Sequence, residues 1–306
     1  MLREAAMRER FFAIVNPAAG GGRSAKLAGP ALMRLRSAGL SVDVIASTGQ
    51  GHVMHLAQEA YQQGYRKFLA VGGDGTAHEI INGIFTENPS PGRIALGFLP
   101  LGTGNSFLRD FSADGEKAAM DALLAGRSRP CDVIRLTHST GAVYSFNIIS
   151  IGFPADVGMT ANRYFKRLGT LGYLLGVFAR VASLSRRPFP LRCDADKEWD
   201  EGRCLFYAFS NSKYTGGTMM IAPQADPTDG LIEVVRWGPI GRLGLIRMLP
   251  RLYDGTHVTH PLASRRAARR IEFRLPGPVN VLVDGEVLEL DLRSVEVIPA
   301  ALDCFV

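Results

Sequence analysis

The sequence predicts two domains: an N-terminal α/β domain with a mostly parallel sheet and a C-terminal antiparallel β-sandwich. Four successive units of strand, glycine-rich loop and helix fill the first 130 residues. Beyond Cys131, short strand-like runs separated by turns replace this alternation. The chain has 306 residues and 46% hydrophobic content, which is enough for two medium-sized cores. We therefore expect a domain of residues 1–132 and a β-rich domain of residues 133–306, whose last residues pack back on the first.

All four α/β units follow one pattern. Strand-like runs such as "FFAIV" and "KFLAV" lead through glycine-containing loops into amphipathic helical segments. Alternating strands and helices are typical of a parallel sheet covered by helices. In such sheets ligands bind beyond the carboxyl ends of the strands. The loops "AAGGGRS", "TGQG", "GGDG" and "LGTGN" are all expected at that edge.

The second part of the chain contains many short strand-like runs, from "CDVIRLTH" to "RSVEVIPA". Turns separate these runs, which is typical of an antiparallel sandwich. Two helical insertions are expected, near residues 160–185 and 240–253. The apolar window 168–184 is shorter than the roughly 20 residues that a membrane span needs. Arg180 also interrupts it, so a buried or interfacial helix is expected.

The loop "GGDGT", residues 72–76, carries the strongest chemical signal. Glycines without Cβ atoms let successive N–H groups turn toward a phosphate, and the following helix offers its N-terminus to the same anion. Thr76 is the expected N-cap of that helix. Asp74 is unusual there because a carboxylate repels phosphate unless a metal ion or a transferred proton offsets its charge. A turn aspartate that only caps the local backbone is the alternative.

Composition and other motifs limit the function classes. The 35 Lys and Arg against 29 Asp and Glu give a net charge of +6, which favours phosphate-bearing ligands or anionic membranes. No nucleic-acid partner is expected. GxxxxGK[ST], a GxGxxG after the first strand and the protein-kinase motifs are missing. Four unpaired cysteines favour a reducing cytoplasm, and His52 and His55 are expected to have surface or capping roles rather than to bind metal.

Three basic clusters, residues 162–169, 186–187 and 265–270, could contact anionic headgroups, although solvated positive faces are the commoner explanation. The segment "MLREAAMRER" lacks an apolar core, so a frayed leader is expected rather than a signal peptide. A cytoplasmic location follows, with peripheral contact to the inner face of the membrane as a further expectation. The sequence leaves a homodimer open.

Five segments in order resemble the diacylglycerol kinase catalytic domain family. They are "IVNPAAGGG" (14–22), "GGDGTAHEIINGI" (72–84), "LPLGTGNSFLRDF" (99–111), "NSKYTGGTMMIAPQADPTDGLIEV" (211–234) and "LVDGEV" (282–287). The resemblance is closest to the single-chain bacterial lipid kinases, which are similar to sphingosine and ceramide kinases. It implies the NAD-kinase/diacylglycerol-kinase-like fold and Mg²⁺- and ATP-dependent phosphorylation of a lipid hydroxyl, such as that of diacylglycerol, in a cleft between the domains.

The resemblance also implies site residues. The nucleotide site would be lined by Asn16, Pro17, Ala18, Ala19, Gly20, Thr48, Gly72, Gly73, Asp74, Gly75, Thr76, Ala77, His78 and Thr103. A magnesium ion would be bound by the Asp229 side chain and by the backbone of Asp226 and Leu231. Glu286 would be the general base, with Asp284 beside it and Asp74 on the nucleotide or metal side. The related sphingosine kinases suggest the reverse for Asp74, so the choice of base stays open.

Two other functions remain. NAD kinases share the "GGDGT" loop and the two-domain plan, so a soluble acceptor is one alternative. A nucleotide-binding regulatory protein without turnover is the other, and the presence of both Asp74 and Glu286 disfavours it. The segment "GFPADV", residues 152–157, carries Pro154 where relatives have an acidic or small residue. Because this segment lies where the acceptor lipid is expected, the identity of the acceptor stays open.

Overall fold

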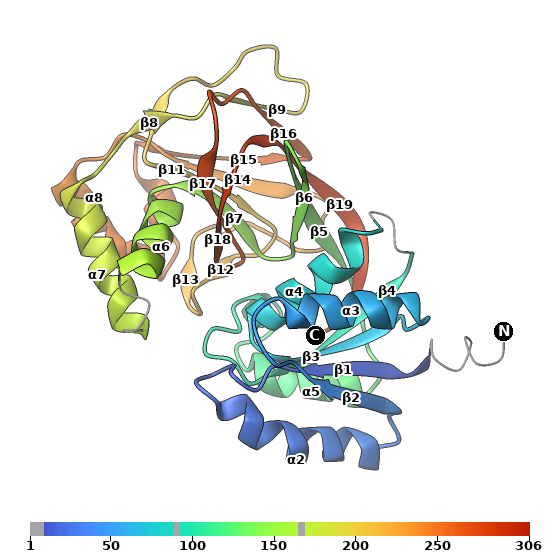
Figure 1. The fold of residues 1–306 in the computed structure, drawn as a ribbon. Helices are drawn as coiled ribbons and strands as arrows, with labels where there is room; N and C mark the ends of the chain where they lie inside the picture. The colour runs from blue at the N-terminus through green and yellow to red at the C-terminus, as the bar shows by residue number, and fades with distance from the viewer. Residues whose placement is uncertain (1–8, 89–91, 165–168) are drawn as a thin grey trace. The chain divides into compact units, whose positions relative to one another are not determined.

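The structure is a computed structural model that describes residues 9–88, 92–164 and 169–306 (Figure 1). It divides into two compact units, residues 1–133 with 298–306, and residues 134–297. Strands β5 (Arg129–His138) and β19 (Leu292–Phe305) each run from one unit into the other. Most of the expected leader and the centre of the basic segment 162–169 lie outside the described residues.

The first unit contains a parallel sheet with the strand order β2-β1-β3-β4, which continues into the end of β19. Each pair in this part is parallel, for example Ile14 with Ala70, or Leu302 with Ile94. The mostly parallel sheet predicted from the sequence is therefore confirmed. Its elements are β1 (Phe11–Val15), α2 (Arg23–Ser37), β2 (Val42–Ala46), α3 (His52–Gln62), β3 (Lys67–Gly72), α4 (Asp74–Phe85), β4 (Ile94–Pro100), η1 (Phe107–Asp110) and α5 (Gly115–Leu124).

Helices cover both faces of this sheet (Figure 1). Alternate strand residues such as Ala13 and Leu69 pack against Leu32 of α2 and Leu123 of α5. On the other side α3 and α4 pack closely, and a Cβ atom on Gly83 would lie 2.2 Å from the Met54 carbonyl oxygen. Strands β1, β3 and β4 are mostly buried on both faces, which is why they are continuous apolar runs, whereas β2 at the edge has exposed positions.

The second unit is an antiparallel sandwich, as predicted. Its six-stranded sheet has the order β15-β14-β11-β7-β17-β18, and every pairing in it is antiparallel. Residues such as Ile149, Phe209 and Val281 pack from this sheet against Ile271 and Val295 of the facing strands. The strands of the unit beyond β5 are β6 (Gly141–Ser145), β7 (Ile148–Gly152), β8 (Arg187–Pro188), β9 (Leu191–Cys193), β10 (Arg203–Cys204), β11 (Phe206–Ser210), β12 (Tyr214–Thr215), β13 (Met219–Met220), β14 (Ile232–Trp237), β15 (Ala263–Ala268), β16 (Arg270–Phe273), β17 (Val279–Val283) and β18 (Glu286–Leu290).

Helices cover the outer face of the six-stranded sheet. Val235 and Trp237 of β14 pack on that side against Val181, Leu245 and Met248. Val181, Leu245 and Met248 belong to the two predicted helical insertions. The helices of these regions are α6 (Phe153–Tyr164), α7 (Gly169–Ala182), α8 (Arg242–Met248), η3 (Leu249–Leu252) and η4 (Thr256–Thr259). Within the described ranges, no helix combines the length and apolarity needed to cross a bilayer.

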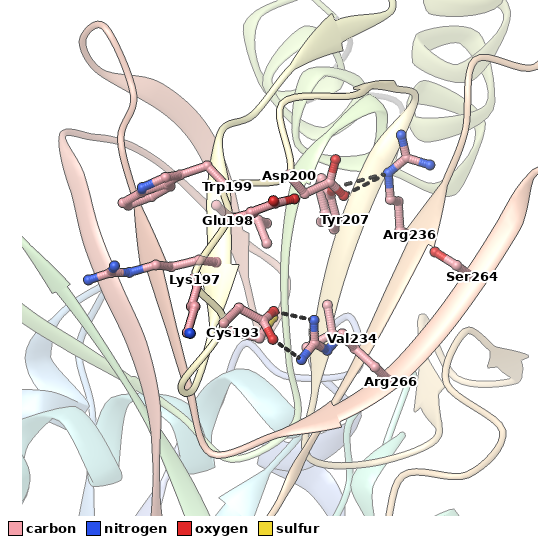
Figure 2. A pocket seen from close by; sticks show the side chains of 13 residues that line it. Cys193, Lys197, Glu198, Trp199, Asp200, Tyr207, Val234, Arg236, Ser264 and Arg266 are labelled. Atoms are coloured by element: carbon pink, nitrogen blue, oxygen red, sulfur yellow. Dashed lines mark hydrogen bonds and ion pairs between the residues drawn. The ribbon is translucent and has the colours of Figure 1, made fainter.

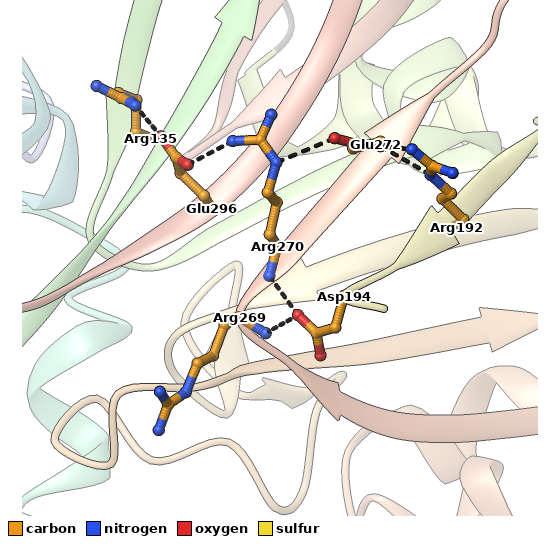
Figure 3. Close-up of polar contacts among 7 residues, drawn as sticks. All are labelled: Arg135, Arg192, Asp194, Arg269, Arg270, Glu272 and Glu296. Atoms are coloured by element: carbon orange, nitrogen blue, oxygen red, sulfur yellow. Dashed lines mark hydrogen bonds and ion pairs between the residues drawn. The ribbon is translucent and has the colours of Figure 1, made fainter. Parts of the chain in front are cut away.

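Paired charges cross one surface of the sandwich (Figure 3). Glu296 binds Arg135 and Arg270, with 2.8 Å between Nη1 of Arg270 and the nearer oxygen. Arg270 also binds Glu272, which receives a 2.7 Å hydrogen bond from Nε of Arg192. This bond from Arg192 is the largest cause that lowers the pKa of Glu272. Exposed pairs of this kind stabilise little individually, but together they neutralise the cations on this surface.

One buried carboxylate holds the corner between β6 and β7. Asp284 lies in the two-residue turn between β17 and β18 and has φ of 48°, followed by Gly285 with φ of 98°. Its carboxylate accepts N–H groups from Phe146, Asn147 and Ile148 at 3.0 to 3.2 Å, and the Ser145 hydroxyl at 2.6 Å. The turn is the Asp-Gly hairpin signal of the sequence, and its side chain also fixes a segment far away in the sequence.

We predict that Asp284→Ala lowers the stability of the second unit by about 3 kcal/mol or more, because several buried donors lose their acceptor. Asp284→Asn keeps a residue that tolerates positive φ and is expected to cost less. Denaturant unfolding followed by tryptophan fluorescence measures this directly, since both tryptophans, Trp199 and Trp237, lie in the second unit. Glu289→Gln on exposed β18 is the control, and an Asp284→Ala midpoint equal to that of the control would contradict the prediction.

Candidate functional site

Three loops of the first unit meet at the carboxyl edge of the parallel sheet. The chain after β1 is joined to β3 by the Asn16 N–H, which donates to the Val71 carbonyl at 2.9 Å. The chain after β4 is joined to β3 by the Gly102 N–H, which donates to the Gly72 carbonyl at 2.9 Å. The predicted nucleotide residues Asn16–Gly20, Gly72–His78 and Thr103 are thus on neighbouring loops of one edge.

The glycines of these loops are required by close backbone approach. A Cβ atom on Gly102 would lie 2.5 Å from the Cα of Gly73, and one on Gly20 would lie 2.4 Å from the Leu101 carbonyl oxygen. Gly20 also has φ of 62°, in the left-handed region. The three loops can pack this closely only because they lack side chains at these positions.

Helix α4 begins at Asp74, and its N-cap is Gly73. The expectation that Thr76 is the N-cap is therefore wrong, because the N-cap lies three residues earlier, at Gly73. Thr76 lies in the first turn and is buried, and its hydroxyl has no hydrogen-bond partner among the described residues. The first N–H groups of a helix have no intrahelical acceptor, so the exposed start of α4 at Gly75 can receive an anion.

Asp74 ties two of the loops together. Its half-buried carboxylate accepts the backbone N–H of Ser106 at 2.7 Å, which fixes the loop that follows β4. A carboxylate in the first turn is also favoured by the helix dipole. The structural role of a loop aspartate, which the sequence left open, is thus present.

The loop after β2 is closed by a histidine. Nδ1 of His52 accepts the Thr48 N–H at 3.0 Å and lies 2.8 Å from the Thr48 hydroxyl. His55 instead pairs with Glu59 at 3.6 Å. Among the described residues, no group of three or more His, Cys, Asp or Glu side chains is arranged to hold a metal ion. His52 caps its loop, as expected from the sequence.

The predicted metal residues of the second unit lie in a tight loop before β14. Asp226 accepts the N–H and hydroxyl of Thr228 at 3.0 and 2.7 Å, and Asp229 accepts the Leu231 N–H at 2.9 Å. Partial burial raises the pKa of Asp229 above its usual value. Asp226, Asp229 and Leu231 line a pocket of about 280 Å³.

Another carboxylate, which no sequence pattern singles out, holds the start of this loop. Glu233 on β14 is 7% exposed, and it accepts the Gln224 N–H at 2.8 Å. Arg265 on β15 lies 3.4 Å from its other oxygen. Burial raises the pKa of Glu233. Only the pairing of β14 with β15, which the sequence does not specify, brings the acid and Arg265 together.

The two predicted catalytic carboxylates differ in their surroundings. Glu286 is exposed at the first position of β18, and within the described part of the chain no side chain forms an ion pair with it. Its neighbour Asp284 is fully engaged by backbone N–H groups, as described above, so Asp284 is a structural residue. Asp74 belongs to the first unit and Glu286 to the second.

The segment expected to contact the acceptor begins α6. Asp156 on this helix is buried, and its carboxylate accepts two 3.0 Å hydrogen bonds from Arg187 and one of 3.1 Å from Asn280. Pro154 is in the first turn of the helix, where a missing N–H costs nothing. The carboxylate of this segment therefore anchors α6.

A pocket of about 500 Å³ lies elsewhere in the sandwich, beneath the segment that follows β9 (Figure 2). Several of its charged lining residues are already paired: Arg266 binds Asp196, and Asp200 binds Arg236 and the Tyr207 hydroxyl. Cys193 in its lining has a pKa raised to about 11 by burial, so the thiol is not a reactive thiolate. These internal pairings leave this pocket a weaker ligand site than the glycine-rich edge.

Comparison with known proteins identifies both units. The diacylglycerol kinase catalytic domain matches residues 10–136, and the YegS C-terminal NAD kinase beta sandwich-like domain matches residues 147–306. A diacylglycerol kinase of Mycobacterium tuberculosis is 29% identical over 95% of this chain and 93% of its own length. A protein of Alcanivorax borkumensis named probable lipid kinase YegS-like is 27% identical over 89% of both chains.

Solved structures show the same fold. A diacylglycerol kinase from Bacillus anthracis superimposes with a TM-score of 0.69 at 19% identity and covers 97% of this chain and 96% of that one. Another structure from that organism gives a TM-score of 0.76 at 21% identity, over 97% of this chain and 95% of that one. With both domain types matched in order, the chain belongs to the family of lipid kinases that joins a diacylglycerol kinase catalytic domain to a YegS-type β-sandwich domain.

Proposed function

We propose that this protein uses ATP and Mg²⁺ to phosphorylate the hydroxyl group of diacylglycerol or a closely related lipid. The observation that carries the proposal is the meeting of three glycine-rich loops at the start of α4, on a chain of a lipid kinase family. Backbone N–H groups at such an edge bind phosphate without requiring a cationic side chain. The names of the relatives in Mycobacterium tuberculosis and Bacillus subtilis support diacylglycerol as the acceptor.

The nucleotide would bind along the loops after β1, β2 and β3. Gly72–Gly75 and the first turn of α4 would donate N–H groups to the phosphates, while Asn16–Gly20 and Thr48 would line the flanks. Thr103, which is exposed after β4, would complete the set. Phosphoryl transfer depends mainly on positioning and charge stabilisation, so a rigid array of donors is the main requirement on this side.

The donor set before β14 fits a magnesium ion. Asp229 supplies a carboxylate, and Asp226 and Leu231 supply backbone carbonyl oxygens, which are the hard oxygen ligands that Mg²⁺ prefers. Bound Mg²⁺ supplies positive charge that offsets carboxylate or phosphate charge and orders the groups around it. The Glu233 and Arg265 pair fixes the preceding Gln224, so the loop is held before any ion binds.

The acceptor hydroxyl would lose its proton to a carboxylate. Glu286 is exposed and without an ion-pair partner among the described side chains, so it is available as the general base. Asp74 holds the Ser106 N–H, and its negative charge would act on the nucleotide phosphates through their metal ion.

A direct assay of acceptors tests the proposal. Purified protein is incubated with radiolabelled ATP and Mg²⁺ and, in separate reactions, diacylglycerol, monoacylglycerol, phosphatidylglycerol, sphingosine, ceramide and NAD. Label in diacylglycerol is the expected result. Label only in NAD would replace the lipid with a soluble acceptor, and label in none of them would favour a binding protein without turnover.

We predict that Asp74→Asn lowers kcat about 100-fold or more while leaving stability nearly unchanged. The amide oxygen of asparagine can still accept the Ser106 N–H, so the loop is retained and only the charge is lost. Asp74→Ala removes both and is expected to lower stability as well. If Asp74→Asn keeps wild-type turnover and only Asp74→Ala is impaired, then Asp74 is a loop anchor and nothing more.

We predict that Glu286→Gln lowers kcat by about 10²- to 10⁴-fold without weakening ATP binding, because a base is lost outside the nucleotide loops. Glu289→Gln is the matched control, since it removes an exposed carboxylate from the same strand. Single-turnover kinetics and calorimetric titration with ATP separate the two effects. Normal turnover by Glu286→Gln together with an inactive Asp74→Asn would reverse the roles of the two residues.

We predict that Asp229→Asn raises the Mg²⁺ concentration for half-maximal activity about 10- to 100-fold, because the only charged ligand of the proposed site is lost. Asp226→Asn is the control: its side chain binds Thr228, and only its carbonyl oxygen would face the ion. Activity measured at fixed ATP over a range of Mg²⁺ concentrations distinguishes them. Equal shifts in both variants, or none, would count against this site.

A further inference from the structure

We infer that the outer face of α8 and the residues after it dock on an anionic lipid bilayer. This surface, called the α8 face, consists of Leu243, Ile246, Arg247, Arg251 and Tyr253. The inference rests on the proposed lipid kinase function and deepens it, since it names the surface through which the enzyme would reach a lipid in a membrane. None of the residues of the α8 face belongs to the proposed catalytic machinery.

Helix α8 has apolar residues on two opposite sides. Leu245 and Met248 point inward and pack against Trp237 in the core beneath the six-stranded sheet. Leu243 and Ile246 point outward, and they are 71% and 47% exposed. A helix that needed only to cover the sheet would have one apolar side, so the outer leucine and isoleucine have no role in the packing of this unit.

The exposure continues beyond α8. Tyr253, just after η3, is 59% exposed, and Phe178 on the neighbouring α7 is 66% exposed. Helices α7 and α8 are adjacent, because Nε of Arg242 donates to the Val181 and Ala182 carbonyl oxygens at 3.1 and 3.2 Å (Figure 1). Single exposed apolar residues are ordinary, but several large ones on adjoining short elements indicate an interaction surface.

The charge on this surface is mainly positive. The sequence has no Asp or Glu from residue 238 to 253, and none from 157 to 193, which includes α7. Within the described ranges, neither Arg247 nor Arg251 makes a salt bridge. The next acid, Asp254, is exposed directly after Tyr253 and accepts the N–H and hydroxyl of Thr256 at 2.9 and 2.6 Å. These hydrogen bonds are the largest cause that lowers the pKa of Asp254, and Arg251 adds to the shift. With two arginines and one acid, the surface keeps an excess of positive charge.

An anionic bilayer fits both properties. Its headgroups supply negative charge for Arg247 and Arg251, and its apolar region receives Leu243 and Ile246. Tyrosine is favoured at the boundary between the two, which suits Tyr253. A second copy of this chain fits less well, because a symmetric contact would place Arg247 and Arg251 of the two copies opposite one another, with Asp254 as the only acid in residues 238–254 of each copy.

The α8 face is held rigidly, as a docking surface requires. Leu245 and Met248 anchor α8 in the core, and Arg242 fixes its start to the end of α7. The ordering of the exposed side chains on binding is therefore the main entropic cost, and the helix itself need not form on the membrane. This differs from peptides that fold only when they reach the lipid surface.

Vesicle sedimentation of the full chain tests the inference. Vesicles of pure phosphatidylcholine are compared with vesicles that also contain phosphatidylglycerol, at low and high salt. Binding is expected to the anionic vesicles and to decrease as salt rises. The double variant Arg247→Gln, Arg251→Gln is expected to bind about tenfold to thirtyfold more weakly, and Leu243→Ser, Ile246→Ser at least about tenfold more weakly.

Matched controls remove similar groups elsewhere. Arg127→Gln with Arg129→Gln removes two exposed arginines of the first unit, and Met33→Ser removes a methionine that is 65% exposed. Both controls are expected to bind like wild type. Equal binding to neutral vesicles, or equal loss in the control variants, would overturn the inference. A dimer that the Leu243→Ser, Ile246→Ser variant dissociates, with unchanged vesicle binding, would instead assign the face to self-association.

A parallel kinase assay separates this inference from the proposed function. Diacylglycerol is presented in neutral detergent micelles, where an electrostatic docking surface gives no advantage. The α8-face variants are expected to keep wild-type micellar activity while losing activity on anionic vesicles. If neither the wild-type protein nor any variant phosphorylates diacylglycerol in micelles, the proposed function fails. Vesicle binding then still tests whether the α8 face is a docking surface. Loss of micellar activity in the α8-face variants would overturn a role limited to docking.

Discussion

The buried carboxylate of Asp284 determines much of the second unit. It collects three backbone N–H groups and a hydroxyl from Ser145–Ile148, so the corner from β6 into β7 is held by a residue of a distant hairpin. The strand β7 lies in the middle of the six-stranded sheet, between β11 and β17. One side chain therefore couples the position of a central strand to the turn that precedes Glu286. The exposed glutamate is placed by the buried aspartate two residues before it, and the two acids of "VDGEV" have different tasks.

Carboxylates also hold the loops of the proposed nucleotide and magnesium sites. Asp74 holds the Ser106 N–H of another loop, and Glu233 holds the Gln224 N–H of the loop that precedes its own strand. In each case a carboxylate accepts a backbone N–H, which is one of the stronger hydrogen bonds available without a cation. Loops that must carry ligand atoms cannot be stabilised by large apolar side chains, because those would occupy the ligand space. Acids that pair with backbone groups give these loops a fixed shape and leave their surfaces open.

The fold class of each of the two domains could be predicted from the sequence because each domain has a consistent pattern. Strand, loop and helix alternate in the first unit, and buried parallel strands such as Lys67–Gly72 appear as continuous apolar runs. Contacts that depend on distant pairing could not be predicted. Nothing near Glu233 indicates Arg265, and nothing near Asp284 indicates Ser145, since these contacts follow from strand order. The cap of α4 was misassigned for a local reason: Gly73 takes the extended conformation of a cap without offering a side chain.

The arrangement of arginines explains how a modest net charge can act locally. On the sandwich surface in Figure 3, Arg135, Arg192 and Arg270 each face a glutamate, so their charges are cancelled within a few ångströms. Arg247 of α8 and Arg251 of η3 lie among apolar residues, and Asp254 is the only acid in residues 238–254. Part of the positive charge of the chain therefore lies where the described residues show no salt bridge to Arg247 or Arg251. Neutralised charges contribute solubility, whereas unneutralised ones beside exposed leucine and isoleucine side chains create a surface that attracts an anionic, partly apolar partner. The positions of the acids, more than the number of arginines, thus decide which side of this unit can bind a membrane.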